Sequence, residues 1–389
     1  MVKPPHLHVD YLSRRGHSRH QKSISGMTAL RVPWLRDQAR ADQKGDNLWL
    51  YIVRRLLTLP LVLLAVTLMI FAMTQALSPY QRAVTYASNP LKLRDGDLET
   101  IIKQYGLDDP IHVQYFRWIN NVAHGNLGWS ETASMPVTEA FAKYLPATLE
   151  LALFTLFVEV ALAVWLGVVA ATHQNRFIDH VLRILGIAGW SLPTYVVAIA
   201  LLGILFGMFG LFPPGRLGLE ASAVVNSVEF VRYTGMNIID SILNGNAMVL
   251  GDALKHLFLP LLTISLVGGA LILRVMRSSM LETLKTDYIT TARSKGLTEK
   301  RVIRKHAFRN ALISVMTIFG MTLASILGGS VVVETVFDYR GLGQWVATAA
   351  TQLDFATIVG FCLFSGAIMV LANLLVDIMY AVIDPRIRL

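Results

Sequence analysis

The sequence contains few charged residues and almost no cysteine. Asp, Glu, Lys and Arg make up 16% of its 389 residues, whereas an ordinary soluble domain has about 25%. The single cysteine, Cys362, lies in an apolar run and cannot form an intrachain disulfide, so we interpret it as a small apolar side chain. A soluble globule of this length has too little interior to bury a chain that is 54% hydrophobic, which favours a lipid environment.

The signatures of enzymes and metal sites are also missing. The sequence has no Gly-x-x-x-x-Gly-Lys-Ser/Thr phosphate loop, no His-Glu-x-x-His pair, no Gly-x-Ser-x-Gly elbow and no Cys/His metal spacing. We therefore expect no catalytic residue, no metal and no cofactor in this chain. The scattered basic residues behind the net charge of +9 do not form one face or tail, so we expect no nucleic-acid partner.

Six apolar runs are long enough to cross about 30 Å of hydrocarbon, which takes about 20 helical residues. They are 56–77, 146–171, 181–212, 257–273, 312–337 and 356–383. The third is interrupted by Ser191-Leu192-Pro193, and we expect a break there because proline lacks an N–H and clashes with the preceding turn. The predicted fold class is an all-α polytopic membrane protein with six transmembrane helices.

Loop charges predict the orientation of these runs. Residues 1–55 carry eleven Lys/Arg against four Asp, and 274–310 carry ten Lys/Arg against three acids. The loops 78–145 and 213–256 show no such excess. Because cytoplasmic loops are enriched in Lys and Arg, we expect both termini in the cytoplasm and the chain in the inner (plasma) membrane.

The same patterns divide the chain into three parts. Residues 1–49 are polar and basic without a cleavage site, so we expect a disordered cytoplasmic extension near anionic lipid. Residues 50–145 comprise the first transmembrane helix and an external segment, with helical periodicity over 97–122. Residues 146–389 form the core, with five transmembrane helices and the cytoplasmic loop 274–310.

Four acids fall within the apolar runs, where burial of charge is expensive. Glu150 and Glu334 lie near an interface and are interpreted as structural. Glu159 is deeper, and Asp377 can pair with a basic residue near the cytoplasmic end. A paired-acid intramembrane hydrolase would need two carboxylates at the same depth, and nothing in the sequence arranges this, so we disfavour that class.

The loop 274–310 contains the most patterned polar segment. We predict a short helix over 287–294 ended by Gly296, then a second helix that begins near Thr298 or Glu299. Tyr288, Ile289 and Ala292 are expected to form an edge that another protein binds. The alternative is a solvated basic loop, which explains the charge but not the glycine.

This strip resembles the cytoplasmic loop of ABC-importer permeases, and most closely that of the B-type subunit of dipeptide/oligopeptide permeases. The runs Asp-Tyr-x-x-Thr-Ala-Arg-x-Lys-Gly-Leu at 287–297 and His-Ala-x-Arg-Asn-Ala at 306–311 carry the resemblance. Further similar runs lie at 54–56, 106–115, 125–128, 145–151, 334–343, 373–377 and 384–388. The general form of the loop has a Glu at the position of Thr290 and a Pro at that of Arg309. The family's Pro-Gly-Asp-Pro is replaced by Ser78-Pro79-Tyr80-Gln81-Arg82, and a proline by Ser314.

The resemblance implies a type I importer fold and one half of a translocation pathway for di- or oligopeptides. Nickel chelates or oligosaccharides are alternative cargoes, and a secondary transporter is the rival class. The implied partners are a C-type permease, two ABC ATPases that bind ATP and Mg²⁺, and an extracytoplasmic solute-binding protein. The implied ATPase-coupling residues are Asp287, Tyr288, Thr291, Ala292, Arg293, Lys295, Gly296, Leu297, His306, Arg309 and Asn310.

Small residues in the fifth run are candidates for the pathway. They allow helices to approach closely or leave the pore wall thin, and we favour packing over direct contact with cargo. They are Gly320, Ser325, Gly328, Gly329 and Ser330.

Overall fold

The computed structural model describes residues 48–86, 96–327 and 330–383, all of them in one compact unit, Asp46–Arg388. The predicted extension 1–49 lies outside these ranges except for its last two residues, as does the closing run 384–388. The described chain is mostly helical. This is what an apolar sequence requires where lipid offers the backbone no hydrogen-bond partner.

The longest helices are α6 (Val137–Thr172) and α11 (Ala247–Thr283), of 36 and 37 residues. At 1.5 Å per residue each is about 54 Å long, more than a membrane requires. The predicted runs 146–171 and 257–273 lie within them, so both helices extend well past their apolar centres. Among the described residues these two and Phe355–Leu375 are long and apolar enough to span a membrane.

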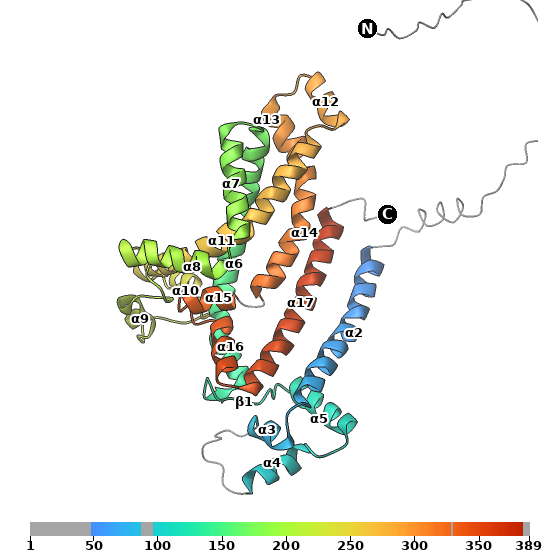
Figure 1. The fold of residues 1–389 in the computed structure, drawn as a ribbon, viewed down its shortest axis with the longest axis vertical. Coiled ribbons are helices and arrows are strands. Elements are labelled where there is room, and N and C mark those ends of the chain that lie inside the picture. Colours follow the sequence, from blue (N-terminus) through green and yellow to red (C-terminus); the bar gives the residue numbers. More distant parts are fainter. Residues whose placement is uncertain (1–47, 87–95, 328–329, 384–389) are drawn as a thin grey trace, which may run out of the picture. The chain divides into compact units, whose positions relative to one another are not determined.

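The structure is built around the pairing of α6 with α11, which lie side by side (Figure 1). Glycines bring the helices together: a Cβ added at Gly167 of α6 would lie 2.7 Å from the Cβ of Met276. A buried cluster of small and aliphatic side chains extends from this contact into the following helices. Close backbone approach is the usual way in which membrane helices gain packing contacts.

The third predicted run is broken where the sequence indicates. Helix α7 (Phe177–Ser191) ends before Pro193, and α8 (Thr194–Leu201) continues through a π-helical segment, Leu202–Met208. The two parts are bent by 108°. Leu192 is extended with ψ 133°, the conformation that a residue before proline favours, so the expected break is confirmed.

The predicted fifth run, 312–337, is wrong in its boundaries. The helix begins with α13 (Glu299–Arg301), passes through π-helical turns at Val302–Ala307 and continues as α14 (Phe308–Leu327). A separate short helix, α15 (Val331–Val336), then packs against α8. Gly328 and Gly329 stand between α14 and α15 in the sequence, and glycine disfavours helix continuation.

The last long helix, α17 (Phe355–Ile383), packs between α14 and α2 (Leu48–Thr74). Figure 1 shows α17 in red beside α14 in orange, with α2 in blue on its other side. The short helix α16 (Leu342–Thr351) connects α15 to α17 and packs against α6 as well.

The predicted helices in 97–122 are present as α4 (Asp97–Tyr105) and α5 (Ile111–Ala123). A short hairpin of two-residue strands follows, in which β1 (Trp129–Ser130) pairs antiparallel with β2 (Met135–Pro136). The loop between the bent span and α11 contains two more short helices. They are α9 (Leu219–Val225) and α10 (Asn237–Leu243).

The segment that departs from the family's Pro-Gly-Asp-Pro forms a capped helix, α3 (Pro79–Val84). The Ser78 hydroxyl accepts from the Gln81 N–H at 3.3 Å, and the Gln81 side chain accepts from the Ser78 N–H at 2.9 Å. Arg82 then donates to the Gln114 side chain at 2.6 Å, which ties α3 to α5. These contacts determine how the chain leaves α2.

The close approach of α6 and α11 predicts the effect of adding one methyl group. Gly167→Ala forces its Cβ against Met276 and Leu273, and we expect overpacking to cost about 1–3 kcal/mol. The matched control is Gly251→Ala in α11, where a Cβ meets nothing within 4 Å and helix propensity improves by about 1 kcal/mol. Thermal unfolding in detergent measures both, and equal midpoints for the two variants would contradict the packing described here.

Candidate functional site

The predicted coupling helix is present as α12 (Asp287–Ser294). Asp287 is in its first turn, where a negative charge complements the helix dipole. Gly296 has φ +75°, its N–H donates to the Arg293 carbonyl at 2.9 Å, and the Leu297 N–H donates to the Ala292 carbonyl at 3.4 Å. This pair of bonds is a Schellman motif, so the predicted glycine stop is confirmed.

The predicted contact edge on α12 is wrong for two of its three residues. Ile289 and Ala292 are buried, at 0% and 7% exposure, among Met280, Val302 and their neighbours in the chain's own core. Tyr288 is 42% exposed. A period of 3.6 identifies an apolar face but not whether the same chain or a partner covers it.

Two side-chain contacts brace α12 against the following helix. Arg293 donates to both carboxylate oxygens of Glu299, at 2.6 and 3.1 Å, and these bonds lower the pKa of the Glu299 carboxyl. Asn310 donates to the Tyr288 hydroxyl at 2.7 Å. The two sequence runs that carry the family resemblance, 287–297 and 306–311, therefore meet in space.

The remaining residues predicted to couple the chain to an ATPase differ in their exposure. Thr291, Lys295 and Arg309 are exposed, whereas His306 and Leu297 are half-buried. His306 lies in the π-helical turns that enter α14. The exposed side of α12 is therefore polar and charged, with the aromatic ring of Tyr288 beside it.

Ser314, which stands where the family has a proline, lies inside α14 without a break in the helix. Its hydroxyl accepts a hydrogen bond from Ser279 of α11 at 2.7 Å. A proline at 314 could not make this bond, which directly links α11 and α14.

An ion pair near α12 was missed by sequence reasoning. Arg277 of α11 donates to both oxygens of Asp179 in α7, at 2.6 and 2.8 Å, and Asp179 is fully buried. The Asn175 N–H also donates to this carboxylate. The only sequence signal was a lone acid in the short link 173–180, and nothing in the spacing identified its partner 98 residues away.

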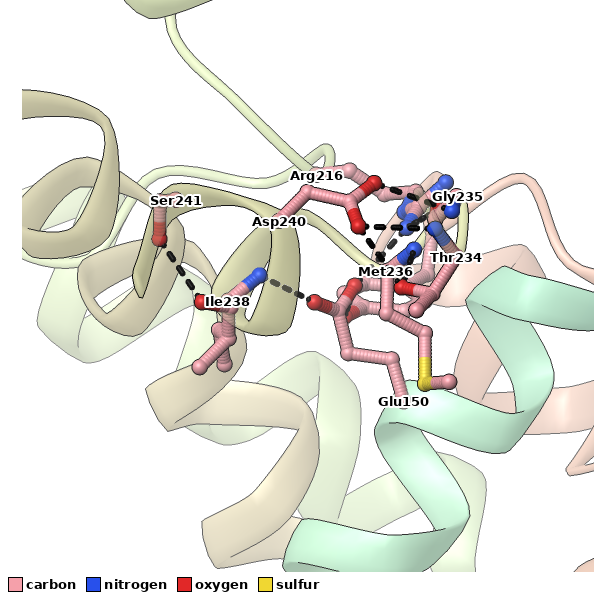
Figure 2. A network of polar contacts seen from close by, with 9 residues as sticks. Glu150, Arg216, Thr234, Gly235, Met236, Ile238, Asp240 and Ser241 are labelled. Atoms are coloured by element: carbon pink, nitrogen blue, oxygen red, sulfur yellow. Dashed lines mark hydrogen bonds and ion pairs between the residues drawn. The ribbon is translucent and has the colours of Figure 1, made fainter. Parts of the chain in front are cut away.

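A second polar network joins α6 to α10 and to the loop that contains Arg216 (Figure 2). Glu150 of α6 is 1% exposed and accepts from Arg216 at 2.7 Å, from the Ile238 N–H at 2.7 Å and from the Tyr339 hydroxyl at 3.1 Å. Asp240 organises the adjoining turn by accepting from the N–H groups of Thr234 and Gly235. Glu150 thus joins three segments that lie far apart in the sequence.

The other acid interpreted as structural, Glu334, is also fully paired. It accepts from the Thr148 hydroxyl at 2.9 Å and from the Gln344 N–H at 3.1 Å. Thr148 in turn accepts from the Leu342 N–H at 2.8 Å, so α6, α15 and α16 are joined at one point. Asp377 is in a part of α17 whose side chains lie outside the described residues.

A cavity of about 710 Å³ opens between α8, α11, α14 and α15, with Glu159 of α6 in its wall. Of the predicted pathway residues, Ser330 lines this cavity, and Gly320 is buried in α14 next to the lining residue Met321. The side chain of Ser325 and both Gly328 and Gly329 lie outside the described residues. Within the described ranges no group of three or more His, Cys, Asp or Glu could hold a metal ion.

Comparison with known proteins agrees with this architecture. Residues 163–389 match the family model for binding-protein-dependent transport system inner membrane components, and 48–152 match the model of its N-terminal region.

Curated relatives cover most of the chain. A dipeptide transport system permease protein of Escherichia coli K12 is 37% identical over 74% of this chain and 84% of its own length. A di/tripeptide transport system permease protein of Pseudomonas aeruginosa is 33% identical over 87% of this chain and 98% of its own. An oligopeptide transport system permease protein of Bacillus subtilis is 36% identical over 87% and 99%.

The Glu150 network predicts unequal effects of single and double substitutions. Arg216→Met leaves a buried carboxylate without its cation, and we expect it to cost about 3–5 kcal/mol of stability. Arg216→Met combined with Glu150→Gln is expected to recover part of that loss, because no charge remains buried. Unfolding midpoints in detergent measure the cycle, with the exposed Arg232→Met as control; strictly additive losses would contradict the pairing.

Proposed function

We infer the function from the family: the chain belongs to the binding-protein-dependent transport system inner membrane components, and we propose that it is the B-type permease of an ATP-driven peptide importer. The observation that carries this proposal is the match along both family regions, together with three relatives named for dipeptide, di/tripeptide and oligopeptide transport. In this proposal it forms half of the translocation pathway with a C-type permease. A solute-binding protein delivers the peptide, and two ATPase subunits hold ATP and Mg²⁺.

The exposed side of α12 is the proposed seat of one ATPase subunit. The Schellman motif, the Arg293–Glu299 pair and the Tyr288–Asn310 bond make α12 and its turn a preorganised projection. Burial of Ile289 and Ala292 joins that projection to α11 and α14. Movement of α12 would then displace the helices that surround the cavity. Closure of the two ATPase subunits on ATP would in this way shift an inward-open pore to an outward-open one.

The finer topology is also a proposal: six spans, with both termini and α12 in the cytoplasm. Support comes from the charge bias of the loops and from the helices α2, α6, the bent pair, α11, α14 and α17 along the chain.

Substitutions on the exposed side of α12 test the coupling role. Asp287→Arg with Thr291→Glu alters this surface without entering the core, because both side chains are exposed. We expect intact membrane insertion but a loss of at least about tenfold in peptide-driven uptake, with ATPase subunits that no longer co-purify or that hydrolyse ATP without transport.

The control for this test is Lys103→Glu in α4, an exposed charge change far from α12 in the sequence. Ala292→Asp is less informative, because a carboxylate there would disrupt the buried core. Full substrate-stimulated uptake by the Asp287/Thr291 variant would refute the coupling role, and failure of the wild type to co-purify with two ATPases would refute the importer.

Cysteine labelling tests the topology. In a Cys362→Ala background, Ser227→Cys lies in the loop 213–256 and Ser294→Cys at the end of α12. A membrane-impermeant maleimide applied to intact cells should label position 227 at once and position 294 only after lysis. The reverse pattern would overturn the proposed orientation.

A further inference from the structure

Glu159 differs from every other buried acid in the described chain. It is 1% exposed, yet neither of its carboxylate oxygens has a hydrogen-bond partner. Glu150, Asp179, Glu334 and Asp354 are equally buried and each accepts two or more hydrogen bonds. The chain therefore satisfies its structural carboxylates and leaves this one without a donor.

The packing around Glu159 is built to accommodate the carboxylate rather than to pair with it. Its oxygens lie directly against Gly268 of α11, where an added Cβ would collide with Oε1, and its side chain also lies against Gly269. Burial of an unpaired carboxylate costs several kcal/mol. An apolar side chain would fill the same space without that cost, so an acid at this position favours a functional role over a packing one.

Two cavities border Glu159. The larger, of about 710 Å³, lies towards α8, α14 and α15, and a smaller one of about 270 Å³ lies between α6, α7 and α11. The larger volume falls within the range of about 300–1,000 Å³ that is usual for small-molecule sites. Glu159 forms part of the wall of both cavities.

The lining of the larger cavity defines what it can accept. Its walls are aliphatic, with the Trp190 ring and the hydroxyls of Thr194, Thr322 and Ser330, and Glu159 is the charged residue among them. No Lys or Arg of the described chain lines this cavity, and a ligand that carries its own cation would neutralise Glu159. A small molecule with apolar side chains and a single ammonium group fits this combination. The face of the Trp190 ring offers the ammonium a cation–π contact as well.

We infer that Glu159 is a specificity-determining residue of the transport pathway, and that its carboxylate binds the α-ammonium group of a peptide occupying the 710 Å³ cavity. This inference rests on the proposed function, because it is the peptide cargo that provides the ammonium. In this arrangement the ammonium donates charge-assisted hydrogen bonds to the carboxylate oxygens.

Binding of two peptides to the wild type and to variants, measured without the solute-binding protein, tests the inference. The purified complex of both permeases and both ATPases is titrated calorimetrically with the dipeptide Leu-Leu and with N-acetyl-Leu-Leu, which lacks the ammonium. We expect the wild type to bind Leu-Leu about tenfold more tightly than the acetylated form, and Glu159→Gln to abolish that preference. Glu159→Asp, which keeps the charge, should retain part of it, whereas Glu220→Gln at an exposed acid of α9 should leave the preference unchanged.

Each other outcome contradicts the inference. An equal loss for both peptides in Glu159→Gln would make the residue a packing element between α6 and α11. Loss of the C-type permease from the Glu159→Gln complex would make it an assembly contact. If peptide-loaded binding protein stimulates ATP hydrolysis but neither peptide binds the complex, the inference fails while the proposed function stands; if there is no stimulation by any peptide, both fail.

Discussion

The close pairing of α6 and α11 is the contact on which the rest of the structure depends. Gly167 on one helix, and Gly268 and Gly269 on the other, remove the side chains that would hold the two axes apart. Because lipid supplies little hydrophobic driving force between helices, such close van der Waals contact has to provide much of the association. Every functional element described above is attached to this pair: α12 follows α11, the bent span packs on it, and Glu150 and Glu159 project from α6.

Two buried ion pairs attach other segments to the α6–α11 pair in similar ways. Arg277 of α11 binds Asp179 of α7, and Glu150 of α6 binds Arg216 from the loop before α9. In both cases the carboxylate is buried and the arginine is partly exposed, so the cation retains some hydration while it neutralises the acid.

Much of this fold was predictable because apolar length and proline act locally. The break at Pro193, the helices at 97–122 and the glycine stop at 296 each depend on a few adjacent residues, and all three are present. The family resemblance was likewise carried by short contiguous runs. The boundary of the fifth run was missed because hydropathy is continuous from α14 into α15, and only the backbone preference of Gly328-Gly329 opposes a single helix.

The candidate site was predictable only in part, because its contacts join residues that are distant in the sequence. The pairs Arg277–Asp179 and Arg216–Glu150 lie 98 and 66 residues apart, and no spacing rule connects them. The burial of Ile289 and Ala292 was missed for a related reason, since an apolar edge looks the same whether its own chain or a partner covers it. That Glu159 has no donor among the described residues could be recognised only from the placed side chains around it.

The continuity of α11 has a mechanical consequence. Its 37 residues, Ala247–Thr283, run without interruption from the Asn246 cap, and three residues separate Thr283 from the start of α12. Because the backbone hydrogen bonds of a helix run along its axis, an axial displacement of the last turn would be transmitted along α11. Bending is different, because Pro260 lies within α11 and has no backbone N–H to donate to the preceding turn. The helix is therefore expected to bend most easily at this residue. The same helix can therefore transmit movement along its axis and still bend at Pro260.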